Sequence, residues 1–151
     1  MKTYNPWDSR VTGVFPNQRT TVERYKIAFT TKDVNVLRQL AKDDDNNVRC
    51  FVALNISTPV NVLRQLAKDK SAKVRQSVAT NQKTPSAIIE QLVADRDDTV
   101  RKSVIYNPNM SVHSDAFHQL MFDQNQEIKI AAVQRWQMEI AVQLKSFCSR
   151  R

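Results

Sequence analysis

The ten residues Val34-Asn-Val-Leu-Arg-Gln-Leu-Ala-Lys-Asp43 occur a second time as Val60-Asn-Val-Leu-Arg-Gln-Leu-Ala-Lys-Asp69. Two looser copies run from Ser86 to Asp95 and from Ser114 to Asp123. A period in the twenties to forties is typical of stacked repeats, in which each unit buries its apolar face only against its neighbours. We therefore expect the leucine that all four copies share to lie in one continuous core. It recurs at intervals of 26, 26 and 28 residues, as Leu40, Leu66, Leu92 and Leu120.

Each repeat begins with the pattern of a short amphipathic helix. In the unit 45–69, Asp45 is the predicted N-cap. Val48, Phe51 and Val52 have the spacing of three and four residues that marks one helix face. Asn55 is expected to end this helix, because asparagine tolerates the left-handed conformation found after many helices. The counterparts are Ser71, Asp97 and Asn125 at the cap, and Asn81 and Asn107 at the end.

A second helix is predicted directly after the first. Thr58 is its expected N-cap with Pro59 at the first helical position, and Thr84 with Pro85 repeat this arrangement. Helices of about ten residues are too short to be stable alone in water, so the two helices of each unit must pack against neighbouring units. The residues expected to face away from the core are Arg64, Gln65 and Lys68.

The combined pattern of Val-Arg, Val-Ala, Asn, Thr-Pro, Leu, Leu-Ala and Asp resembles the variant leucine-rich repeat family over residues 22 to about 135. The resemblance implies an all-α fold, a right-handed α-solenoid of about four 26-residue two-helix units that is similar to HEAT repeats. In that family each unit pairs an α-helix with a 3₁₀ helix. Some members carry an N-terminal iron–sulfur cluster held by a group of cysteines. The first fifty residues here contain only Cys50, so no redox role is expected.

We predict a single domain over residues 1–151 that has three parts. Residues 22–127 form the repeats. Residues 1–21 contain apolar side chains among turn-forming residues, and either fold over the first repeat as a cap, which we favour, or form an arm with Trp7 as a docking residue. Residues 128–151 form a capping helix, whose last turns are an alternative partner or dimer surface. Its apolar stripe is Ile128, Ala132, Trp136, Ile140 and Leu144.

Composition narrows the class of protein. A single glycine, Gly13, excludes glycine-rich phosphate loops and dinucleotide fingerprints, which need several glycines. Cys50 and Cys148 make no disulfide framework and no four-ligand metal site, so we treat both as ordinary thiols. No apolar run approaches the roughly 20 residues of a membrane helix, and no signal segment is recognisable. We expect a cytoplasmic, bacterial protein without a cofactor or metal.

The formal net charge is +8, and most of the excess lies at the two ends of the chain. Residues 1–31 contribute +3, residues 32–126 contribute +2 and residues 127–151 contribute +3. The repeats are therefore nearly neutral, which disfavours one long basic groove.

A column of basic residues recurs in the units, each six residues after an aspartate. The same offset is found in HEAT-like repeats, where acid and base join adjacent turns. We interpret the column as a structural ladder rather than a phosphate-binding one, since shielded networks stabilise more than the roughly 0–1 kcal/mol of isolated surface pairs. The predicted ladder is Asp43 and Arg49, Asp69 and Arg75, Asp95 and Arg101, and Asp123 and Lys129.

The polar face of the second helices is the candidate partner surface. The later units lack these arginines, because Glu90 and His118 occupy the corresponding positions. These side chains form either a solvated helix face or a ligand-facing surface. Leu54, Tyr106 and Phe122 are either satellite core residues or partner contacts. The candidate partner residues are Arg38, Gln39, Lys42, Arg64, Gln65, Lys68, Gln91 and Tyr106.

Three functions follow as hypotheses. The first is a non-catalytic module that binds a macromolecule, with a protein as the predicted partner. The second is an enzyme similar to HEAT-like alkylpurine DNA glycosylases, whose site would contain Trp136 and either Asp115 or Tyr106. No sequence spacing connects these residues. We therefore predict that the protein is not an enzyme. His113 and His118 lack companions at metal-ligand spacing. The third, which is our alternative to a protein partner, is nucleic-acid binding. It would use Arg38, Lys42, Arg64, Lys68 and the terminal residues Arg10, Arg19, Lys145, Arg150 and Arg151.

Overall fold

The computed structural model describes residues 19–148, with the side chains of residues 19–146, and every regular element in that range is an α-helix. The all-α prediction is thereby confirmed. The first helices of the units are α2 (Thr21–Thr30), α4 (Asn46–Leu54), α6 (Ala72–Thr80), α8 (Asp98–Ile105) and α10 (Gln126–Cys148). The second helices are α3 (Val34–Leu40), α5 (Val60–Leu66), α7 (Ser86–Leu92) and α9 (Asp115–Leu120).

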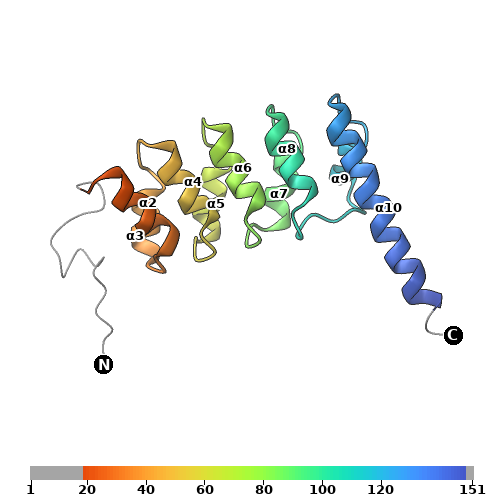
Figure 1. Cartoon of the computed structure of the whole chain (residues 1–151), viewed down its shortest axis with the longest axis horizontal. Helices are drawn as coiled ribbons and strands as arrows, with labels where there is room; N and C mark the ends of the chain where they lie inside the picture. The colour runs from red at the N-terminus through yellow and green to blue at the C-terminus, as the bar shows by residue number, and fades with distance from the viewer. Residues whose placement is uncertain (1–18, 149–151) are drawn as a thin grey trace.

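The helices stand side by side along the long axis of the molecule (Figure 1). Each first helix packs against the next one along the chain, from α2 through α4, α6 and α8 to α10. Each second helix contacts the first helix before it and the first helix after it. The repeated sequence units therefore occupy neighbouring places in the structure.

One hydrophobic core runs through the described units, from Ile27 to Ala132. The shared leucine is the last residue of each second helix, and all four copies are buried in this core. The identical segments of α3 and α5 bury the same positions, because Val36 and Leu37 on α3 correspond to Val62 and Leu63 on α5. The expectation of a shared leucine seam agrees with this burial.

The helix starts follow local capping chemistry. The Asp45 carboxylate accepts a hydrogen bond from the Asn47 amide, and Asp97 accepts one from Thr99. Thr20 and Glu23 form a complete capping box at the start of α2. Ser71 occupies the N-cap of α6 without a side-chain bond to the helix.

The predicted start of the second helices is wrong by one residue. Pro59 and Pro85, rather than the threonines before them, occupy the N-cap positions of α5 and α7. The hydroxyls of Thr58 and Thr84 instead donate to the carbonyls of Val52 and Val78 in the preceding first helix, and both threonines are buried. The second helices are α-helical, not 3₁₀ as the family resemblance implies.

The left-handed conformation predicted for Asn55 and Asn81 is also wrong. Asn55 and Asn81 end α4 and α6 with extended backbones, at φ −69° and −70°. Asn107 lies one residue beyond Tyr106, the C-cap of α8. Side-chain hydrogen bonds to the preceding unit, described below, explain why asparagine occupies these places.

The last helix is longer than its counterparts and extends past the other helices (Figure 1). It begins at Gln126, two residues before the predicted start. Its apolar stripe is buried at Ile128 and Ala132, partly buried at Trp136, and exposed at Leu144. The predicted cap over residues 1–21 lies outside the described residues, except for its last three. Within residues 19–148 no helix has both the length and the apolar character needed to cross a bilayer.

Candidate functional site

Arginine–aspartate pairs recur at equivalent positions of the described units. In each pair a first-helix arginine bonds to the aspartate that follows the next second helix. The pairs are Arg24 with Asp43, Arg49 with Asp69, Arg75 with Asp95, and Arg101 with Asp123.

Arg75 shows the geometry of this ladder. Its Nε lies 2.6 Å from Oδ2 of Asp95 and its Nη2 lies 2.8 Å from Oδ1. Its Nη1 donates to the carbonyl of Asp69 at 2.8 Å. The Arg75 and Asp95 side chains are each 7% exposed. This bidentate, charge-assisted contact consumes most of the donors of the guanidinium.

The structure corrects the pairing that the sequence offset suggests. The acid six residues earlier, which ends the preceding unit, supplies only its backbone carbonyl, as Asp69 does for Arg75; the carboxylate comes from the aspartate that ends the arginine's own unit, as Asp95 does. Arg24 starts the ladder although it is not among the predicted members. Lys129 makes no ion pair among the described residues. A phosphate-binding column would require arginines without other partners, whereas these arginines are bound to aspartates of the protein itself.

The ladder lowers the pKa of the carboxyl groups of Asp69, Asp95 and Asp123. For Asp123 the hydrogen bonds from Arg101 are the main cause. For Asp69 and Asp95 burial by itself raises the pKa, but the bonds from the partner arginine and from a backbone amide outweigh it, and the net pKa lies below the usual value of 3.8. These carboxylates thus stabilise the folded state while they are ionised.

We expect the free energy of unfolding to fall as the pH is lowered from about 6 to about 3. A carboxyl group whose pKa is depressed by folding contributes its full stabilisation above the unfolded pKa, near 3.9, and loses it as the pH falls through the folded pKa. Urea denaturation at several pH values measures the slope. The Asp123→Asn variant should lose less stability on acidification than the wild type does. Parallel profiles for the two proteins would contradict this coupling.

Buried asparagines form a second set of links between units. The Asn81 side-chain amide donates to the carbonyls of Ala53, at 2.6 Å, and Asn55, at 3.1 Å, and its oxygen accepts from the Lys83 amide. Asn55 and Asn107 make equivalent bonds to the units before them. All three asparagines are between 2% and 6% exposed. They satisfy the carbonyls left open at the end of the preceding first helix.

Arg135 takes the place of asparagine in the last unit. Its Nη1 donates to the carbonyls of Ile105 and Asn107, and its Nη2 donates to the carbonyl of Met110 at 2.7 Å. The guanidinium also lies 5.5 Å from the centre of the Phe117 ring. Burial lowers the pKa of Arg135. Like the ladder arginines, Arg135 is therefore a structural cation.

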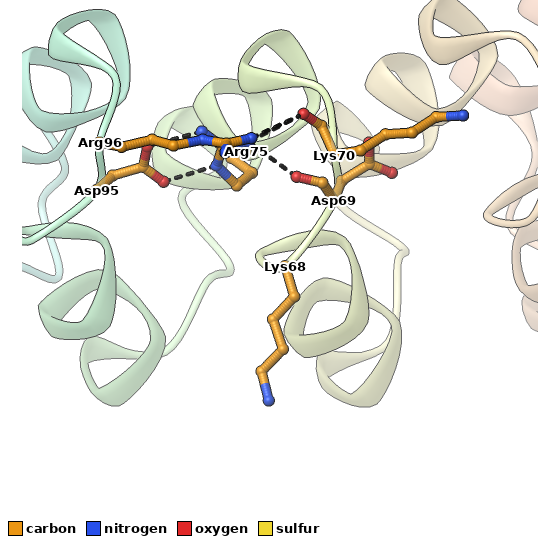
Figure 2. Close-up of a pocket in the computed structure, with 6 residues that line it drawn as sticks. All are labelled: Lys68, Asp69, Lys70, Arg75, Asp95 and Arg96. Atoms are coloured by element: carbon orange, nitrogen blue, oxygen red, sulfur yellow. Dashed lines mark hydrogen bonds and ion pairs between the residues drawn. The ribbon is translucent and has the colours of Figure 1, made fainter.

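A shallow hollow of about 310 Å³ lies beside the ladder between two successive turns (Figure 2). Arg75 crosses it and bonds to acceptors on both sides, while Lys68 and Lys70 point away from it. Arg96 reaches the carbonyl of Lys70 at 3.5 Å. The polar groups in the hollow satisfy one another, so it offers no reactive centre. The lining residues are Lys68, Asp69, Lys70, Arg75, Asp95 and Arg96.

The candidate partner residues of the second helices are all exposed. Arg38 and Gln39 lie on α3, Arg64 and Gln65 lie on α5, and Gln91 lies on α7. The two lysines of the set lie in the turns that follow α3 and α5. None of the four cations makes an ion pair with an acid in the described part of the chain. They are Arg38, Lys42, Arg64 and Lys68.

Tyr106 does not belong to this surface. It ends α8, a first helix, and lines a separate hollow of about 200 Å³ with Thr80, Ser103 and Asn107. Phe122 and Leu54 are exposed rather than satellite core residues. No hydrogen bond or ion pair connects Tyr106, Asp115 and Trp136 within residues 19–146, so the structure gives these residues no common site.

The histidines and Cys50, which could in principle bind a metal ion or act as nucleophiles, do not form a common site in the described structure. His113 lies 3.0 Å from the Gln143 side chain through its Nε2, and His118 is exposed on α9. Burial raises the pKa of the Cys50 thiol, which disfavours a nucleophilic thiolate. Among the described residues no three His, Cys, Asp or Glu side chains gather where they could hold a metal ion.

The chain matches no family model, no curated protein and no solved structure. The resemblance to variant leucine-rich repeats therefore stays a prediction.

Proposed function

We propose that this protein is a helical-repeat interaction module, a right-handed α-solenoid of the variant leucine-rich repeat type, that binds a protein partner without catalysis. The sequence period and the succession of two-helix units along the molecule support the architecture. The unengaged cations on α3 and α5 are the observation that supports binding.

Two kinds of arginine occur in the same repeat. Arg49 and Arg75 have their donors bound by carboxylates and carbonyls of the protein itself. Arg38 and Arg64 are exposed and have no ion-pair partner in the described structure. A free guanidinium can bind a carboxylate of another molecule in a bidentate manner, whereas an engaged one cannot.

The composition of this surface indicates an acidic partner segment. Because α3 and α5 have identical sequences, Arg38, Gln39 and Lys42 are repeated as Arg64, Gln65 and Lys68 with the same local geometry. Successive first helices pack against each other, and packed helices are about 8–10 Å apart, so we take consecutive units to repeat at about this spacing. Three residues of extended chain span about 10 Å. An extended segment with a carboxylate at every third residue would therefore place successive acids over successive units. The glutamines can bond its backbone.

Nucleic acid is the alternative partner, because phosphates can replace carboxylates and the chain carries a net charge of +8. The positive surface ends early, since Glu90 and Ala94 occupy the corresponding positions in the next unit. Four contacts to phosphates would give duplex binding a logarithmic salt slope of about −3.6.

Fluorescence anisotropy with a labelled peptide that has glutamate at every third position tests the proposal. The Arg38→Glu/Arg64→Glu variant should bind at least about tenfold more weakly than the wild type, because two attractive contacts become repulsive. The matched control is Lys26→Glu/Lys73→Glu, which makes the same charge change on exposed positions of first helices. Its affinity should change much less.

The outcomes separate the hypotheses. Equal weakening in both variants would show a general charge effect and reject the proposed surface. Binding of a DNA duplex with a slope near −3.6 and no binding of the peptide would replace the protein partner with nucleic acid. Peptide binding that falls with salt and requires Arg38 and Arg64 supports the proposal.

A further inference from the structure

The exposed side of α2 and α4 carries an aromatic patch. On α2 its members are Val22, Tyr25 and Phe29, whose spacings of three and four residues place them on one stripe of the helix. On α4 they are Phe51 and Leu54. The Phe51 ring joins the two helices, since its centre lies 5.6 Å from that of Tyr25 and 6.0 Å from that of Phe29. Val22 is 60% exposed, Phe29 is 61% exposed and Leu54 is 37% exposed, so much of the patch faces solvent.

This aromatic patch ends at α6. That helix follows α4 at an interval of 26 residues, and it has Ser77 at the position of Phe51. It has Thr80 at the position of Leu54. The same surface of a first helix can therefore be polar in this protein, whereas an exposed apolar patch marks a site where another segment binds. The patch belongs to the two units at the amino-terminal end of the described structure (Figure 1), which directly follow residues 1–18 in the chain.

We propose that residues 7–15 of the same chain bind the aromatic patch. These residues lie outside the described structure, and their apolar side chains are Trp7, Val11, Val14 and Phe15. Phe15 precedes Val22 by seven residues. Seven residues of extended chain reach up to about 25 Å, and the stripe from Val22 to Phe29 is about 10 Å long, so Phe15 can contact any part of it.

The covalent connection favours this occupant over a second copy of the protein. A segment held by a short flexible linker has an effective concentration in the millimolar range, which a second copy reaches only in very concentrated solution. Contact between the segment and the patch removes apolar surface of both from water. The patch is formed by first helices, whereas Arg38 and Arg64 lie on second helices, so this proposal does not depend on the proposed function.

Limited digestion with trypsin tests the contact, because Arg10 lies within the proposed segment. In the native full-length chain, cleavage after Arg10 should be at least about tenfold slower than in a free peptide of residues 1–18, since the protease cuts only the released segment. Phe29→Ser should restore most of the rate of the free peptide. The matched control is Phe122→Ser, because Phe122 is 82% exposed in the turn after α9, and it should leave the rate unchanged.

The fluorescence of Trp7 gives a second measurement that needs no cleavage. In a Trp136→Phe background Trp7 is the only tryptophan. Its emission should lie at shorter wavelength than in the free peptide, and Phe29→Ser should shift it to longer wavelength. The protection of Arg10 should stay constant over about a hundredfold range of protein concentration, because the contact lies within one chain.

Three results would overturn the proposal. The first is cleavage after Arg10 as fast as in the free peptide. The second is an equal rate in Phe29→Ser and the wild type. The third is protection that increases with protein concentration, which would assign the patch to a second copy.

Discussion

Replacing Asn81 with alanine is expected to lower the free energy of unfolding by about 2–4 kcal/mol. The side chain is 3% exposed and makes hydrogen bonds to two carbonyls and one amide. Its removal leaves buried polar groups without partners, at a cost of about 1–3 kcal/mol each unless water enters. Denaturation by urea, followed by the helical circular dichroism signal, measures the change.

The isosteric Asn81→Asp variant separates hydrogen bonding from packing. A carboxylate has the same shape but no donor for the carbonyls of Ala53 and Asn55, so we expect at least as large a loss at neutral pH. Asn61 is exposed on α5 and provides the matched controls Asn61→Ala and Asn61→Asp, which should change stability by less than about 0.5 kcal/mol. Equal effects at the two positions would show that the asparagine links do not stabilise the stack.

Replacing Arg75 with methionine should cost about 2–3 kcal/mol. The variant leaves Asp95 covered but without its counter-ion, and it removes the bond to the Asp69 carbonyl. Breaking a deeply buried pair costs about 3–5 kcal/mol. Arg75 and Asp95 line the shallow hollow, which solvent can enter, so we expect a smaller loss. Urea denaturation gives the value, with the exposed Arg64→Met as the control of equal charge.

A second substitution tests the cause of that loss. Adding Asp95→Asn to Arg75→Met should restore at least about 1 kcal/mol, because the unpaired charge disappears while an acceptor for the Asp97 amide remains. If the double variant is less stable than Arg75→Met, then loss of the counter-ion is not the main penalty. If Arg75→Met is as stable as the wild type, then the ladder does not stabilise the folded state.

The sequence period predicts which residues occupy equivalent positions in the repeats. It does not predict which of these residues contact one another. In a 26-residue repeat, the aspartate six residues before Arg75 and the one twenty residues after it belong to the same column. Only the packing of successive units decides that Asp95 supplies the carboxylate and Asp69 the carbonyl. The same ambiguity explains why Arg24 was not predicted, although it lies 25 residues before Arg49 and shares its column.

Interactions between residues close in sequence are sufficient to predict several helix starts. They are not sufficient to predict the role of the buried asparagines. The cap of Asp45 depends only on the next two residues, so it could be predicted from the sequence. The recurrence of Asn55, Asn81 and Asn107 in the sequence predicts only a local helix stop. Their bonds run to the preceding unit, 24 to 28 residues away, which no local rule contains. The place of Arg135 in this series could be found only from the structure.

The proposed function depends on separating two sets of arginines that composition alone cannot distinguish. The ladder arginines stabilise the contacts between units, and the second-helix arginines are free to bind. This separation also explains why a net charge of +8 does not by itself indicate nucleic acid, since the charges are spread over sites with different partners.

The most direct test is an NMR titration that follows the Nε–Hε signals of the arginine side chains while the glutamate-repeat peptide is added. We predict that the signals of Arg38 and Arg64 shift and saturate with the binding curve. The signals of Arg49 and Arg75 should be protected from solvent exchange and stay in place, because their Nε atoms already lie 2.7 and 2.6 Å from carboxylate oxygens. Movement of the Arg49 and Arg75 signals with no change at Arg38 and Arg64 would contradict the account.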